Sequence, residues 1–216
     1  MPQTVRAIIL STTKVGDRSL VLHCLCREGG RRSFIVSVGR KAGMALFLPL
    51  NIIEGEVVEN RRTDLWRLHH ISSAAPLEGI RGNVYKNSIC LFMSEVLYRC
   101  IHDGEGDAEL FDWCCRSIAA LDSLEAGWSN FHLRWLMELS AALGFSPTKE
   151  SIAPFAGGRY SEICALLDAD LASFLTAPLN GTARGEIADV LLRYLSSHTE
   201  CSLNIRSLAV LSEVLR

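Results

Sequence analysis

The first 71 residues contain short apolar runs separated by turn-forming residues. Val, Ile, Leu and Phe dominate the runs, and Gly, Asn or Asp stands between them. The runs cover residues 5–11, 18–26, 32–39, 50–59 and 65–71. In the second run, Leu20, Leu22, Cys24 and Cys26 alternate with other residues and therefore share one face of a strand. Five such strands predict a small closed barrel, because closure leaves no unpaired strand edge.

The rest of the chain has a helical pattern. Apolar residues recur at spacings of three and four, as on the buried face of a helix. We expect helices at residues 85–102, 110–121, 128–143, 170–175, 185–197 and 206–215, with an irregular connection at 146–158. The boundary between the two patterns falls near residues 75–82. The fold class is therefore α+β, with a five-stranded barrel domain at residues 1–78 and an all-α domain at residues 79–216.

Charge is divided unevenly along the chain. The formal net charge is −2, but residues 1–86 contain 13 Lys and Arg against 7 Asp and Glu, whereas residues 87–216 contain 9 against 17. A positive first part and a negative second part indicate different partners for the two. The apolar run at residues 7–10 is too short for a signal peptide, and no window resembles a membrane span. We therefore expect a cytoplasmic protein whose eight cysteines are free thiols.

Basic residues gather in the predicted turns of the strand region. Arginine suits a phosphate group, because its planar fork donates two hydrogen bonds at once. Phe34, Phe47 and Trp66 are close enough in sequence to offer stacking faces to bases, although each such residue is more often part of a core. The alternative for the basic residues is a solvated surface. The candidates for nucleic-acid binding are Arg27, Arg31, Arg32, Arg40, Lys41, Arg61 and Arg62.

Motifs of enzymes and metal sites are missing from the sequence. It contains no Walker A loop and no nucleophile elbow. The acidic segment 103–109 has Ala108 and Cys114 where a calcium loop needs Gly and Glu, so a solvated turn before a helix is the better interpretation. Cys24-x-Cys26 and His69-His70 lack a second pair at zinc-finger spacing. We therefore expect no catalysis, no cofactor and no bound metal.

Several segments follow one another in an order that can be compared with known families. The opening AIILSTTKVGDRSLVLHCLCREGGRRSFIVSVGRK and the following LPLNIIEGEVVENRRTDLWRLHHI resemble the first strands and basic turns of the RecO family of recombination mediators. NSICLFMSEVLYRCI, LFDWCCRSIAAL, FHLRWLMELSAALGFSP and SLNIRSLAVLSEVL are similar to its helices. The resemblance covers nearly the whole chain as a series of weak patterns.

This resemblance implies a fold, an activity and a set of partners. The first domain would be an OB-fold, and the second a helical domain without enzymatic turnover. Members bind single- and double-stranded DNA, anneal complementary strands and work with RecR and RecF. They help to load RecA onto strands coated by single-strand binding protein. The helical domain would capture the acidic, aromatic C-terminal tail of that protein, for which we expect Phe131, Arg134, Trp135 and Arg193 to provide apolar and cationic contacts. Alternatively, Phe131 and Trp135 are core residues and Arg134 is solvated.

Two departures from the family pattern limit the resemblance. Many members carry a four-cysteine zinc module after the Leu-Gly-aromatic-x-Pro turn, but here the region 146–164 contains only Cys164. The basic tract after Gly39 is reduced to Arg40 and Lys41, which would weaken binding to DNA. Two other functions stay open: a protein-interaction scaffold whose barrel does not bind DNA, and a hydrolase with an unrecognised site.

Overall fold

The structure is a computed structural model that describes residues 3–38, 43–58, 65–104, 106–199 and 201–215. The chain forms two compact units. One contains residues 1–78 together with 101–118, and the other contains residues 79–100 together with 119–216. The expectation that 1–78 and 79–216 are the two domains stays a prediction. No helix in the described ranges is long and apolar enough to cross a membrane.

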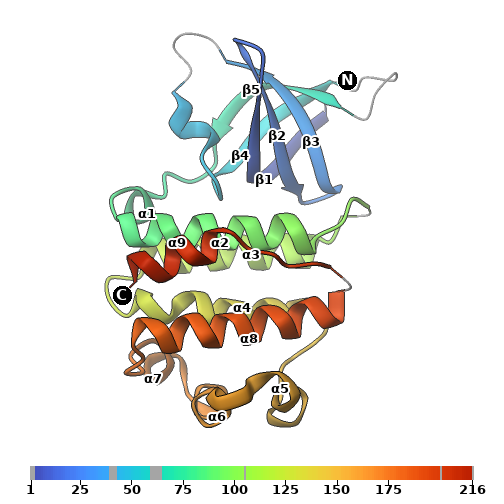
Figure 1. Cartoon of the computed structure of the whole chain (residues 1–216). Coiled ribbons are helices and arrows are strands. Elements are labelled where there is room, and N and C mark those ends of the chain that lie inside the picture. The colour runs from blue at the N-terminus through green and yellow to red at the C-terminus, as the bar shows by residue number, and fades with distance from the viewer. Residues whose placement is uncertain (1–2, 39–42, 59–64, 105, 200, 216) are drawn as a thin grey trace. The chain divides into compact units, whose positions relative to one another are not determined.

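The strands form a closed barrel in the order β1-β2-β3-β5-β4 (Figure 1). The strands are β1 (Gln3–Val15), β2 (Ser19–Cys26), β3 (Gly30–Ser37), β4 (Ile52–Val58) and β5 (Trp66–Ser73). β1 closes the barrel, because its first half pairs with β4 and its second half with β2. β3 and β5 pair in parallel, whereas the other pairs are antiparallel. This arrangement is that of an OB-fold and confirms the predicted barrel.

Alternation along β2 supplies much of the barrel core. Leu20, Leu22, Cys24 and Cys26 are buried, as the sequence pattern predicts. Burial raises the pKa of the Cys24 and Cys26 thiols, that of Cys26 to about 12, so both thiols stay protonated and apolar. Phe34 and Phe47 also belong to this core, so these two rings are not free to stack on a ligand.

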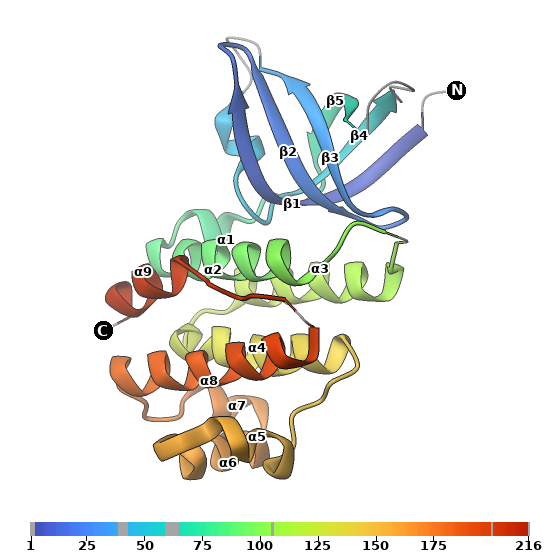
Figure 2. The ribbon, with the colours of Figure 1, turned by 45° about the vertical axis from the view of Figure 1, so that its right-hand side comes forward.

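The second unit consists of helices. The helices of the chain are α1 (Glu78–Arg81), α2 (Val84–Cys100), α3 (Ala108–Ser123), α4 (Phe131–Ala142), α5 (Lys149–Ala156), α6 (Tyr160–Asp168), α7 (Leu171–Leu175), α8 (Gly181–Thr199) and α9 (Ser207–Val214). The first residue of α1 and residues 108–118 of α3 belong to the barrel unit, and the rest belong to the second unit. α4 lies beside α8, and α9 lies along α2 (Figures 1 and 2). The predicted succession of barrel and helices is therefore confirmed.

The expectation of an irregular connection at 146–158 is wrong. Residues 149–156 form α5, and Thr148 caps it by accepting a hydrogen bond of 3.1 Å from the backbone of Ser151. Ile152 is buried, and Phe155 contacts the Tyr194 ring of α8 edge-on at 5.7 Å. The Pro and Gly residues misled the sequence interpretation, because Pro154 lies inside the helix and Gly157 follows its end. Packing of α5 therefore orders a region for which the sequence predicted no regular structure.

Candidate nucleic-acid interface

The turn between β2 and β3 brings three of the predicted arginines together. Cys26 pairs with Gly30 at the end of the two strands, and Gly30 has a positive φ of 61°, which glycine adopts without strain. Arg27 enters this turn, and Arg31 and Arg32 leave it on β3. The segment 101–118 belongs to the same unit and passes the turn so closely that a Cβ on Gly106 would lie 2.5 Å from the Gly29 nitrogen.

Arg27 is held by a carboxylate from this segment. Its Nε and Nη2 each donate a hydrogen bond of 3.0 Å to the two oxygens of Asp112 in α3. The hydrogen bonds from Arg27 lower the pKa of the Asp112 carboxyl, and those same bonds raise the pKa of Arg27. Both side chains remain about 40% exposed, so water competes for the pair and the interaction is weak.

Arg31 is held in a similar way. Its Nε donates a hydrogen bond of 2.8 Å to Oδ1 of Asp103, whose side chain is 75% exposed. This hydrogen bond lowers the pKa of the Asp103 carboxyl. Nearby, His23 Nδ1 and Ser33 Oγ share a hydrogen bond of 2.8 Å. Burial, and next the charge of Arg31, lower the pKa of His23, so this ring stays neutral at pH 7.

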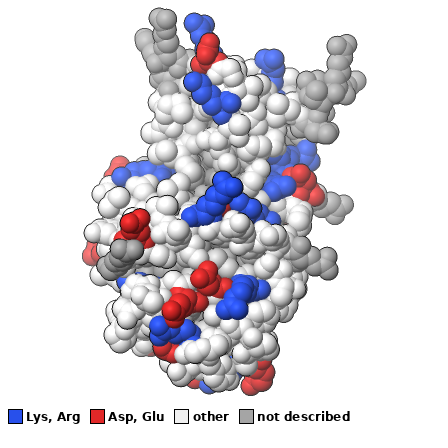
Figure 3. Space-filling view, in the orientation of Figure 1, with Lys and Arg blue, Asp and Glu red and all other residues white. Residues whose placement is uncertain are grey.

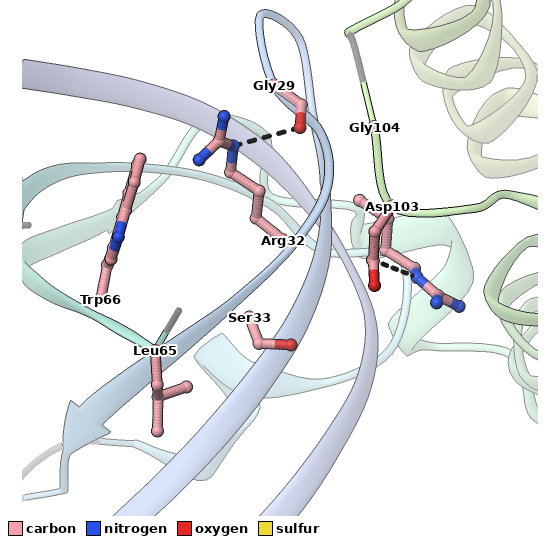
Figure 4. Close-up of a pocket in the computed structure, with 8 residues that line it drawn as sticks. Gly29, Arg32, Ser33, Leu65, Trp66, Asp103 and Gly104 are labelled. Carbon is pink, nitrogen blue, oxygen red and sulfur yellow. Dashed lines mark hydrogen bonds and ion pairs between the residues drawn. The ribbon is translucent and has the colours of Figure 1, made fainter. Parts of the chain in front are cut away.

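Arg32 has an aromatic neighbour where Arg27 and Arg31 have acidic ones. Its guanidinium carbon lies 4.4 Å from the centre of the Trp66 ring, within the range of a cation–π interaction. Its Nε donates a hydrogen bond of 3.1 Å to the Gly29 carbonyl (Figure 4). Two contacts therefore fix the plane of this guanidinium, and in the part of the chain that the structure describes no carboxylate forms an ion pair with it.

An open cavity of about 590 Å³ is lined by Gly29, Arg31, Arg32, Ser33, Leu65, Trp66, Asp103 and Gly104. Figure 4 shows the Arg32 side chain extending toward Trp66, with Leu65 below them and Asp103 on the opposite side of the view. The lining thus combines an aromatic ring, a hydroxyl and two arginines, one of which is paired with the Asp103 carboxylate. Such a mixture suits a ligand that is planar and anionic at the same time, as a nucleotide is.

Comparison with known proteins identifies the family. The family model described as "Recombination protein O N terminal" matches residues 1–77, and "Recombination protein O C terminal" matches residues 81–153. The chain belongs to the RecO family. It is 36% identical over 154 residues to the DNA repair protein RecO of Phocaeicola vulgatus, and the match covers 69% of this chain and 64% of that protein.

Two further RecO relatives differ in how far the match extends. The protein of Flavobacterium psychrophilum is 29% identical over 232 residues, which cover 97% of each chain. The protein of Bacteroides fragilis is 36% identical over 151 residues, which cover 68% of this chain and 62% of that protein. The match to the Phocaeicola protein therefore spans less than two thirds of that relative, whereas the match to the Flavobacterium protein spans almost all of that one.

The structure places only part of the basic surface expected for a RecO chain. Arg40, Lys41, Arg61 and Arg62 lie outside the described residues. Figure 3 shows small groups of basic side chains, several with acidic side chains beside them, on the face in view. Sequence reasoning missed Asp103 and Asp112, which hold two of the arginines. For Asp103 the signal lies in the acidic segment 103–109, for which the sequence predicts only a turn before a helix. Asp107 of that segment caps α3 by accepting a hydrogen bond of 2.9 Å from the Leu110 nitrogen.

The residues expected to bind the partner tail in this RecO chain do not gather at one place. Trp135 is 1% exposed, and its ring lies 6.5 Å from that of Phe92 inside the helical unit. Arg134 donates a hydrogen bond of 2.6 Å to Glu138. Phe131 is half-buried at the start of α4. Arg193 is exposed on α8 and donates a hydrogen bond of 3.0 Å to the Phe155 carbonyl.

Arg193 lines a different surface. A cavity of about 440 Å³ is formed by residues 156–159 and by Glu186, Asp189, Val190 and Arg193 of α8. The Arg134 guanidinium instead lies 5.6 Å from the Phe174 ring of α7. The two cations that we grouped from the sequence are therefore on separate surfaces of the helical unit. In the described ranges, no group of three or more His, Cys, Asp or Glu residues could hold a metal ion.

Proposed function

We propose that this chain acts in DNA repair as a DNA-binding recombination mediator. It binds and anneals single-stranded DNA through the barrel unit and assists the loading of RecA onto strands coated by single-strand binding protein. One observation carries the proposal: in a RecO-family chain, the β2–β3 turn of an OB-fold barrel carries Arg27, Arg31 and Arg32, and the last two of these line an open cavity. OB-folds bind oligonucleotides at such places, beside strand 3 and the loop before strand 5.

Arg27 and Arg31 would bind DNA by exchanging their carboxylate partners, Asp112 and Asp103, for phosphate groups of the DNA backbone. The carboxylate partners Asp112 and Asp103 are 40% and 75% exposed, so breaking either pair costs little when a DNA phosphate can take its place. Phosphate also accepts two hydrogen bonds from one guanidinium, as Asp112 does now. Binding through these residues therefore depends on salt but not on base sequence.

The test is the titration of a labelled single-stranded oligonucleotide at several salt concentrations. The double variant Arg27→Ala, Arg31→Ala should bind more weakly, and its log–log salt slope should fall by about 1.4 if each arginine contacts one phosphate. Lys14→Ala, Arg18→Ala is the matched control, because it removes the same charge from exposed positions at the other end of β2. An equal loss in both variants would mean general attraction rather than a site.

The alternative is a scaffold whose barrel binds no DNA. It predicts no saturable binding of the oligonucleotide even at low salt, and both double variants would then behave as the wild type does. We propose no enzymatic turnover, in keeping with membership of the RecO family of recombination mediators. Ser33 of the cavity lining does share a hydrogen bond with His23, so this pair is the one that a hydrolase hypothesis would use. Turnover that depends on a metal or a nucleotide would revive the hydrolase hypothesis.

The protein partners remain proposals. We propose that RecR and the C-terminal tail of single-strand binding protein bind this chain directly, and that RecF and RecA act with it indirectly. Because Trp135 is buried, the tail would have to use Phe131, Arg134 or Arg193. Calorimetry with a tail peptide and the full chain tests this, and Arg134→Ala and Arg193→Ala separate the two surfaces. If the wild type releases no heat of binding, the tail proposal fails.

A further inference from the structure

Trp66 is placed to do more than fill the barrel. It begins β5 and pairs with Phe34 of β3, and one side of its half-buried indole packs against the barrel core. The other neighbour of the ring is the Arg32 guanidinium at 4.4 Å. A planar cation stacked on an indole at the edge of a cavity is an arrangement on which a further planar ring can stack.

Gly29 keeps this stack in position. Its carbonyl accepts the Nε hydrogen bond of Arg32, so that edge of the guanidinium is not available to a phosphate. A Cβ on Gly29 would lie 2.3 Å from Nε and 3.1 Å from Cζ of Arg32. Any larger residue at this position must therefore displace the Arg32 side chain. Gly29 is not at a positive φ, so alanine fits the backbone there without strain.

The cavity has room for a base and polar groups for its edge. Its volume of about 590 Å³ lies within the range of about 300–1,000 Å³ that is usual for sites of small ligands. Arg32, whose terminal nitrogens can donate hydrogen bonds, and Ser33, whose hydroxyl also shares a hydrogen bond with His23, line it. Arg31 lines the cavity too, but it precedes Arg32 on β3, so its side chain points to the other face of this strand.

We infer that this cavity binds one unpaired nucleobase, stacked on the Trp66–Arg32 pair. The inference rests on the proposed function and adds to it a contact that recognises the base rather than the backbone. A base inside a duplex is stacked on its neighbours and cannot enter, so the cavity favours single strands over double strands. Every base has a π face, so the contact does not select a sequence.

The test compares two strands of equal length and charge, one of thymidines and one of abasic sites, bound to the full chain at one salt concentration. Wild type should bind the thymidine strand about fivefold or more tightly, which is the lower end of what stacking one base on an aromatic side chain contributes. In Trp66→Leu the two affinities should become nearly equal, with an unchanged salt slope. Trp128→Leu, which removes an indole of the other unit, is the control and should keep the wild-type ratio.

The variant Gly29→Ala tests the same stack while Trp66 and Arg32 are both retained. It should reduce the preference for the thymidine strand, because Arg32 must move. If Trp66→Leu does not fold, photocrosslinking of wild type to a strand containing 5-iodouracil replaces it, and the adduct should map to Trp66. Equal affinity of wild type for both strands, a preference retained in Trp66→Leu, or adducts only at other residues would overturn the inference. The proposed function would survive those results; it fails if neither strand binds.

Discussion

The turn at the end of the barrel and the α4–α8 surface were both expected to bind a partner, and they differ in how the structure uses their residues. At the barrel, Arg27, Arg31 and Arg32 belong to one turn, and Arg31 and Arg32 line the same cavity. On the helices, Trp135 is buried and Arg134 lies over Phe174, away from Arg193. Short sequence spacing in a tight turn guarantees proximity, whereas spacing along two helices does not.

The first prediction concerns Trp135 and has the largest expected effect. Trp135→Ala removes a fully buried indole that packs against Phe92, and should lower the free energy of unfolding by about 3–5 kcal/mol. Urea denaturation followed by circular dichroism measures this loss. A stable variant that has lost only the binding of the tail peptide would restore Trp135 as a binding residue and remove the contrast with the barrel.

Glu95 tests whether charges in the helical unit stabilise the fold. Its carboxylate accepts hydrogen bonds from the backbone nitrogens of Arg206 and Ser207 at 3.1 and 2.8 Å, and so caps the start of α9. Burial alone would raise the pKa of Glu95, but the hydrogen bonds from Ser207 and Arg206 and the charge of Arg99 outweigh it and lower the pKa. Glu95→Gln should cost about 1–2 kcal/mol of stability near pH 7.

The pH dependence follows from the sign of this shift. A lowered pKa in the folded state stabilises the protein above the ordinary value of 4.5, and the stabilisation is lost as the pH falls through the folded-state value. Thermal unfolding of wild type and Glu95→Gln between pH 7 and pH 3 should therefore show curves that approach each other at low pH. A constant difference across this range would mean that Glu95 acts by packing alone.

Asp112 tests whether an acidic residue of the barrel unit, unlike Glu95 of the helical unit, opposes function by holding a DNA-binding arginine. Asp112→Asn removes the charge that holds Arg27, so the affinity for single-stranded DNA should rise about two- to fivefold. Glu109→Gln is the matched control, because it removes the same charge from an exposed position on α3. Equal gains in both variants would show that only the net charge matters, and a weaker Asp112→Asn would show that the pair positions Arg27 for binding.

The sequence predicted the barrel well because the constraint is local. Alternation in β2 and glycine at the β2–β3 turn leave few other ways to pair these strands. The sequence did not predict the ion pairs of Arg27 and Arg31. Arg27 and Asp112 are 85 positions apart, and Arg31 and Asp103 are 72 positions apart. Trp66 was one of three aromatic candidates, and only burial separates it from Phe34 and Phe47. A single sequence thus does not determine which distant residues form ion pairs or which aromatic side chains become buried.

The smallest expected effect is that of Arg134, which has the geometry of a surface residue. It forms an i, i+4 pair with Glu138, and about a third of its side chain is exposed. Such pairs contribute about 0.3–0.5 kcal/mol, so Arg134→Ala should hardly change the midpoint of urea unfolding. The variant is therefore well suited to a binding experiment, because a loss of affinity for the tail peptide could not be assigned to unfolding. If Arg134→Ala weakens the peptide and Arg193→Ala does not, the α4 surface binds the tail; the reverse result moves the site to the cavity beside α5. A stability loss as large as that of Trp135→Ala would instead show that the contact with Phe174 belongs to the core.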